Sequence, residues 1–163
     1  EKNTKTHKCQ GWIVFFRKGN TMRKIKIIKL AAIERAQDKI YPAGCTLIPL
    51  SASAPELVRF LETASAVENR FAVVIPNEKV IPEFLFITVQ RASARFFHTY
   101  QTGINLQFNT LLKYFKVEFT ENKERQSEIV EAVRKCDQIA LKEELAIGVL
   151  KEIKRNMLQR MFP

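Results

Sequence analysis

The chain of 163 residues is long enough for one domain with an appendage, and its 46% apolar residues, including twelve Phe, can bury a core. Its apolar runs, such as Trp12 to Phe16, are far shorter than the ~20 residues that cross a bilayer, and none resembles a signal peptide, so we expect no membrane segment. Cys9, Cys45 and Cys136 are too far apart for a disulfide framework or a close-spaced zinc site, which favours a reducing, cytoplasmic location.

The net charge of +10 is unevenly distributed. Residues 1–29 hold nine Lys or Arg against one Glu, residues 30–122 hold nine of each sign, and residues 123–163 hold nine against seven. A nucleic-acid-binding face in the neutral middle would therefore require Arg and Lys to gather on one side.

Three regions are expected. Residues 1–21 are Lys- and Thr-rich and precede Met22, which fits a chain start, so we interpret them as a basic lead-in that need not be native. Residues 22–122 should form a compact α+β domain, and residues 123–163 one long helix.

Within the middle region the elements follow from hydrophobic period and turn residues. Lys24 to Ile27 alternates like an edge strand, and residues 30–36 fit a helical turn or a strand continuation. A turn at Tyr41 to Gly44 leads into a buried strand over residues 45–50. Residues 56–62 have a helical apolar face, residues 70–75 read as a buried strand ended by Pro76, and Pro82 opens a helix. Residues 99–109 predict a loop entering a strand, and β preference returns in the second half of residues 111–119.

From Lys123 to Phe162 only Gly148 weakens a continuous helix. Ile129 as heptad position a gives ten a and d sites, of which only Glu143 and Arg160 are charged. This stripe predicts an intermolecular partner for the helix, either a second copy or another subunit. The interface candidates are Ile129, Val133, Cys136, Ile139, Ala146, Leu150, Ile153 and Met157.

The order of these features resembles the specificity subunits of type I restriction-modification systems. The resemblance rests on five stretches: Ile40 to Ala52, Arg70 to Pro76, Ile81 to Phe86, Gly103 to Asn109, and Arg125 to Ile129, followed by the helix end at Leu150 to Phe162. The chain departs from the family at the junction before the long helix and in size. At the junction, the family's Pro-Pro-Leu turn is replaced by residues 119–123, and Arg125 precedes Gln126 where the family has Glu-Gln.

The resemblance implies a target-recognition domain that reads one half of a split site in double-stranded DNA, and a coiled-coil helix that spaces it from a second such domain. Methylation and cleavage would belong to a DNA methyltransferase subunit and a restriction subunit, so neither catalysis nor a cofactor or metal is expected in this chain. One domain and one helix, without an internal repeat, suggest a half-length form completed by an antiparallel homodimer.

Candidate DNA contacts are the residue types that pair with bases or phosphates in the major groove, where Arg and Lys suit guanine and Asn and Gln suit adenine. They cluster around the expected 56–62 helix, after the Pro82 helix, and in the Gly103 loop and strand. The candidates are Arg59, Arg70, Arg91, Arg95, Gln101, Thr102, Asn105, Gln107 and Asn109. Each could instead be ordinary solvated surface, and Asn105 and Asn109 could cap turns.

Other chemistry is less favoured. The Phe residues at 84, 86, 96, 97 and 108 suit a core better than a stacking platform for single strands. Glu121-Asn-Lys123 has a spacing found in metal-dependent nucleases but lacks a partner Asp, and His98 lies in no recognisable motif. The competing function is a helix-mediated interaction protein, or a truncated relative, whose domain no longer reads DNA.

Overall fold

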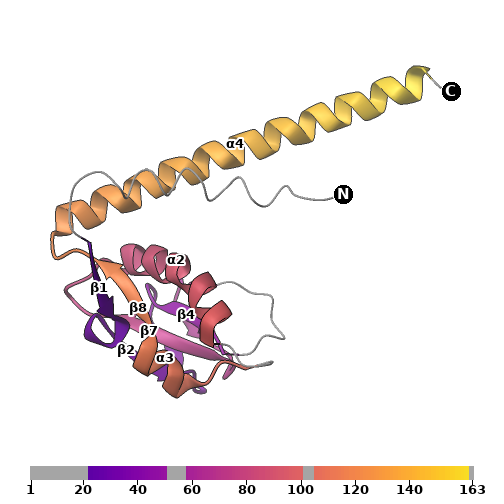
Figure 1. Ribbon diagram of the computed structural model, residues 1–163. Coiled ribbons are helices and arrows are strands. Elements are labelled where there is room, and N and C mark those ends of the chain that lie inside the picture. The colour runs from indigo at the N-terminus through magenta and orange to yellow at the C-terminus, as the bar shows by residue number, and fades with distance from the viewer. Residues whose placement is uncertain (1–21, 51–57, 101–104, 162–163) are drawn as a thin grey trace.

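The computed structural model describes residues 22–50, 58–100 and 105–161, which form a sheet-containing domain followed by one long helix (Figure 1). The expected α+β class is confirmed. The strands are β1 Arg23–Lys26, β2 Ala31–Arg35, β3 Ile40–Tyr41, β4 Thr46–Pro49, β5 Arg59–Phe60, β6 Ser65–Ala66, β7 Phe71–Pro76 and β8 Lys116–Phe119. The helices are the 3-10 turn η2 Ile27–Lys29, then α2 Pro82–Tyr100, α3 Phe108–Tyr114 and α4 Lys123–Met161.

A four-stranded antiparallel sheet in the order β2-β7-β4-β5 forms the centre of the domain. Every residue of β4 and the first four of β7 are buried, as the continuous apolar runs in the sequence predict. The turn before β4 requires Gly44, whose φ of +89° lies in the region that side chains disfavour. The pairs β1–β8 and β3–β6 form two smaller antiparallel sheets.

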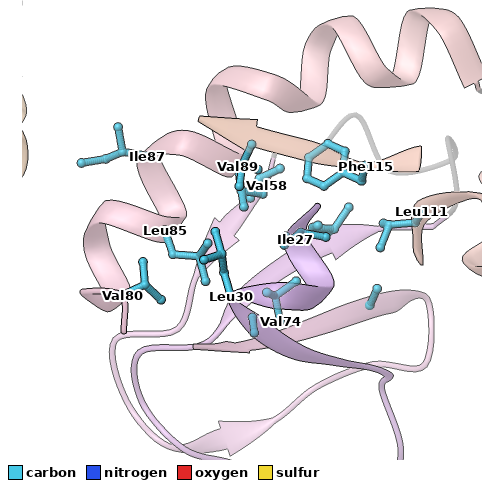
Figure 2. Packing of buried hydrophobic residues seen from close by; sticks show 14 of the residues in the cluster. Ile27, Leu30, Val58, Val74, Val80, Leu85, Ile87, Val89, Leu111 and Phe115 are labelled. Atoms are coloured by element: carbon cyan, nitrogen blue, oxygen red, sulfur yellow. The ribbon is translucent and has the colours of Figure 1, made fainter. Parts of the chain in front are cut away.

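Side chains that alternate along β7 divide the core into two clusters. Ala72 and Val74 belong to the larger cluster, which α2 covers with Phe84, Leu85 and Val89. Figure 2 shows part of this cluster, with Val74 near Leu30. Phe115 and Leu111 lie on the right of this view, on the opposite side of the cluster from Val80 and Leu85. Phe71 and Val73 belong to the smaller cluster, which also contains Tyr41 and Cys45.

Two expectations are wrong. Residues 59–60 are strand and not helix, because Arg59 and Phe60 pair with Leu47 and Thr46 of β4 and extend the sheet. The Phe60 ring also lies 5.4 Å from the Phe86 ring of α2, centroid to centroid, which fixes this strand against the helix. Val58, Leu61 and Glu62 of the expected 56–62 helix are not helical either, and residues 56 and 57 lie outside the described residues.

The loop and strand expected over residues 99–109 are replaced at their start by the end of α2 and at their end by α3. Thr99 and Tyr100 continue α2, and Phe108 opens α3. Phe108, Leu111 and Leu112 of α3 pack on the larger cluster at a helical spacing. This tertiary contact outweighs the alternating pattern that favoured a strand.

The long helix α4 is anchored at its first turns. The Asn122 side-chain oxygen accepts a hydrogen bond from the Arg125 amide at 3.0 Å, which caps the helix. Ile129 and Val130 are buried against the domain, and Val133 packs beside them. Beyond these turns α4 extends away from the domain (Figure 1).

Candidate nucleic-acid interface

Arg59 and Arg70 meet at one ring. The Arg59 guanidinium lies 5.8 Å and the Arg70 guanidinium 5.3 Å from the centroid of Phe71. Arg59 comes from edge strand β5, and Arg70 directly precedes β7. These two strands are not neighbours in the sheet, yet both cations lie at one end of it. Contact with an aromatic face restrains the orientation of a guanidinium.

An acidic neighbour balances part of this charge. The Arg70 Nε and a Glu68 carboxylate oxygen are 2.7 Å apart, and the Glu68 side chain is 67% exposed. A pair this exposed contributes little free energy, in the range of about 0–1 kcal/mol. A phosphate or a base edge can therefore compete for Arg70.

The polar residues that precede α3 are tied to the same end of the sheet. The Leu106 amide donates to the Leu50 carbonyl at 2.8 Å, and the Leu50 amide donates to the Arg70 carbonyl at 2.8 Å. Leu106 is buried, whereas its neighbours Asn105 and Gln107 are exposed. The structure thus brings Asn105 and Gln107 to the sheet end that carries Arg70. Gln101 and Thr102 lie outside the described residues.

The other candidates are placed elsewhere. Arg91 forms an ion pair with Glu118 of β8 at 3.2 Å, and Arg95 is exposed one turn further along α2 on the same side. Because Phe86 of α2 faces β5, about 140° around the helix from Arg91, this side is turned away from Arg59. Asn109 is exposed in the first turn of α3.

The aromatic residues are mostly core. Phe84 and Phe96 are buried, and Phe86, Phe97 and Phe108 pack partly buried against the larger cluster. Sequence reasoning missed an exposed aromatic pair, Tyr100 and Tyr114, whose rings stack at 5.2 Å between centroids. The Lys113 ammonium lies over the Tyr114 ring. Only the tertiary packing of α2 and α3 brings these two tyrosines together.

The interface candidates on α4 fall into two groups. Ile129 is 1% exposed and Val133 is partly buried, so both contact the chain's own domain. From Cys136 onward the candidates are exposed, with Leu150 at 64%, Ile153 at 49% and Met157 at 59%. Ile139 and Ala146 are exposed as well. The free stripe therefore starts about two turns after the last buried residue of the helix, Val130.

Gln126 is a residue whose role the sequence did not reveal. It is fully buried, and its side-chain oxygen accepts from the Ile81 amide at 2.8 Å. Its side-chain nitrogen donates to the Thr120 carbonyl at 2.8 Å and to the Lys79 carbonyl at 3.2 Å. Gln126 therefore joins α4 to the segment before α2 and to the end of β8. An ion pair between Arg134 and Glu83, 2.9 Å long, adds a second link between α4 and α2.

Groups that could support catalysis are dispersed. Lys123 donates from Nζ to the Glu78 carbonyl at 2.7 Å, which gives it a structural partner, and Glu121 and His98 are exposed. Burial raises the pKa of the Cys45 thiol, so that thiol stays protonated at neutral pH. Within residues 22–50, 58–100 and 105–161 no three His, Cys, Asp or Glu side chains are grouped as metal ligands. None of the helices in these ranges is both long and apolar enough to span a membrane.

No protein-family model and no curated protein sequence matches this chain. Solved structures do match its fold. The S subunit of a type I restriction-modification system from M. genitalium is 13% identical, with a TM-score of 0.61 over 75% of this chain. A chain from a structure that describes the structural basis of complex assembly and conformational transition in the type I R-M system is 13% identical. Its TM-score is 0.65 over 85% of this chain. The HsdS subunit from Thermoanaerobacter tengcongensis is 11% identical, with a TM-score of 0.55 over 80%.

The match covers 41%, 45% and 41% of those three chains, so this chain spans less than half the length of the structures that it resembles. The matches include 75–85% of this chain. The chain therefore has the fold of part of a type I restriction-modification specificity subunit.

Proposed function

We propose that this chain recognises a specific sequence in double-stranded DNA, as a specificity component of a type I restriction-modification system. The observation that carries the proposal is the shared fold, matched over 75–85% of this chain. On this proposal the chain is not an enzyme. Methylation and cleavage are supplied by methyltransferase and restriction subunits in the cytoplasm, and the chain directs them to one half of a bipartite target.

The reading surface is the sheet end that carries Arg59 and Arg70. A guanidinium can donate two hydrogen bonds to the O6 and N7 atoms of guanine, or pair with a phosphate. Asn105 and Gln107 carry the amide groups that suit the N6 and N7 atoms of adenine. Phe71 orders the two cations before DNA arrives, which lowers the entropy lost on binding.

Helix α4 is the assembly surface. Apolar side chains exposed over about the last six turns of a helix favour burial against another helix. A second copy of the chain would supply the second half-site, and the methyltransferase subunit would dock against the resulting helix pair. On this assignment the DNA target consists of two separated half-sites, and the length of the helix pair sets the distance between them.

Selection of binding sites from a random double-stranded DNA library tests the recognition function. We expect one enriched sequence, with an affinity that falls steeply as salt rises. Arg70→Ala should lower affinity by about 1–3 kcal/mol and relax one base position if Arg70 reads a base, or weaken all sequences equally if it contacts a phosphate. Lys24→Ala, which removes the same charge from β1, is the matched control and should change little.

Binding without any enriched sequence would contradict the proposal. The second candidate function, a helix-mediated interaction protein, would then apply. The exposed residues from Ile139 to Met161 specifically favour it, since they need a partner whether or not the domain reads DNA. Loss of binding in Lys24→Ala equal to that in Arg70→Ala would show that the DNA-binding face has been placed wrongly.

A further inference from the structure

The turn before β7 fixes the backbone around Arg70. The Phe71 amide donates to the Glu68 carbonyl at 3.1 Å, which closes a four-residue turn with Glu68 first and Arg70 third. Arg35 of β2 donates from Nε to the carbonyl of Asn69, the second residue of the turn, at 3.4 Å. Hydrogen bonds therefore hold the backbone next to Arg70 before any ligand is bound.

The Arg70 side chain is held along one edge of its guanidinium. The two Glu68 carboxylate oxygens lie along the Nε–Nη2 edge, 2.7 Å from Nε and 3.2 Å from Nη2. Nε is itself shielded from solvent, and the Phe71 ring centroid lies 5.3 Å from the guanidinium carbon. Among the described residues, none accepts a hydrogen bond from Arg70 Nη1. The open edge of Arg70 is therefore the one formed by Nη1 and Nη2.

We infer that Arg70 reads a guanine through this open edge, and that Glu68 is the residue that positions it. Nη1 and Nη2 together present two parallel N–H groups, which match the O6 and N7 atoms of guanine in the major groove. No other base presents two adjacent acceptors there, because adenine offers an acceptor beside a donor, thymine an acceptor beside a methyl group, and cytosine a donor. This inference rests on the proposed DNA-recognition function and names the base that one position of the target requires.

The charge of Glu68 favours a base over a phosphate as the ligand of Arg70. The Glu68 side chain is 67% exposed, so a phosphate that approached the guanidinium would also approach a carboxylate. A guanine is neutral and can meet the open edge without displacing Glu68. Glu68 therefore weakens contacts with the DNA backbone, which carry no sequence information, and orients Arg70 for the contact that does.

Competitive binding of the full chain to its selected duplex, and to duplexes changed at single positions, tests the inference. Arg70→Lys keeps the charge but lacks a two-donor edge. The guanine preference at one position, about tenfold or more in the unaltered chain, should therefore fall to about threefold or less. Glu68→Ala removes the carboxylate that orients Arg70, so it should cause a similar loss at the same position. Its affinity for random duplexes should rise by about two- to fivefold at low salt, because a negative charge is removed.

Glu68→Gln separates the two effects of Glu68. The amide oxygen can still accept from Arg70 Nη2, so this variant should keep most of the guanine preference while its affinity for random duplexes rises as in Glu68→Ala. Glu128→Ala is the matched control, because Glu128 forms an equally short ion pair with Arg125 on α4, at 2.7 Å. It should leave the guanine preference unchanged, and circular dichroism should show equal folding in all variants.

The inference would be overturned if Glu68→Ala kept the full guanine preference, or if it weakened the target and random duplexes by the same factor. An equal loss of preference in Glu128→Ala would overturn it as well. A selected sequence in which every position survives Arg70→Lys would refute this inference alone. An unaltered chain that selects no sequence would refute the recognition function and this inference with it.

Discussion

Replacing Gln126 with Leu should lower the free energy of unfolding by about 3 kcal/mol. The change keeps the side-chain volume near that of Gln but removes hydrogen bonds to the Ile81 amide and to the Thr120 and Lys79 carbonyls. A buried hydrogen bond contributes about 1 kcal/mol net, and three of them give the stated loss. The abandoned backbone groups lie at a partly buried junction, so water can reach some of them and the larger penalty for sealed polar groups does not apply.

Urea denaturation followed by far-ultraviolet circular dichroism measures this change, at matched protein concentration so that self-association contributes equally. The corresponding fall in Tm is about 6–12 °C for a chain of this size. Gln138→Leu, on the exposed part of α4, is the control and should change stability by no more than about 0.5 kcal/mol. A loss below about 1 kcal/mol in Gln126→Leu would refute the view that Gln126 anchors the helix.

The remaining predictions concern two glycines and a thiol. Gly44→Ala should destabilise the domain by about 1–2 kcal/mol, because Gly44 has a positive φ and a new Cβ would lie 3.3 Å from Pro82. Gly148→Ala should stabilise α4 by about 0.5–1 kcal/mol, because a new Cβ there would meet nothing within 4 Å. Thermal denaturation of both variants checks this pair, and a lower Tm for Gly148→Ala than for Gly44→Ala would contradict the reasoning. Burial, with a smaller effect of Glu34, raises the pKa of Cys45 above its ordinary value of 9.0. The folded state therefore holds the Cys45 proton more tightly, and the free energy of unfolding should fall as pH rises above about 9. This fall should be less steep in Cys45→Ala. Urea titrations at several pH values that give the same dependence of the free energy of unfolding on pH in both proteins would contradict this.

Elements with a strong internal pattern were predictable from sequence. Strand β7 was visible as an apolar run closed by Pro76, and α4 as a long stretch without a breaker. Strand β5 was not, since a strand of two residues exists only through its pairing with β4. Helix α3 was hidden by the alternating residues before it, although Phe108, Leu111 and Leu112 already had helical spacing.

The candidate site was predictable in its residue types and not in its grouping. Arg59 and Arg70 were chosen from sequence, but their meeting at Phe71 depends on the neighbouring strands β4 and β7. In the sequence, Arg91 could not be distinguished from Arg59 and Arg70 as a candidate DNA contact. Its ion pair with Glu118 joins residues that are 27 positions apart, so the sequence did not reveal it. Gln126 looked like any solvated helix residue, because two of its three side-chain partners lie 45 and 47 residues away.

The junction at Gln126 also works as the pivot of a lever. With 39 residues rising about 1.5 Å each, α4 is about 58 Å long, so a tilt of about 5° at its base moves the far end by about 5 Å. That displacement exceeds one base-pair step of about 3.4 Å. The three Gln126 hydrogen bonds and the Arg134–Glu83 pair oppose such a tilt. The position of the far end of α4 therefore depends on these contacts at its base.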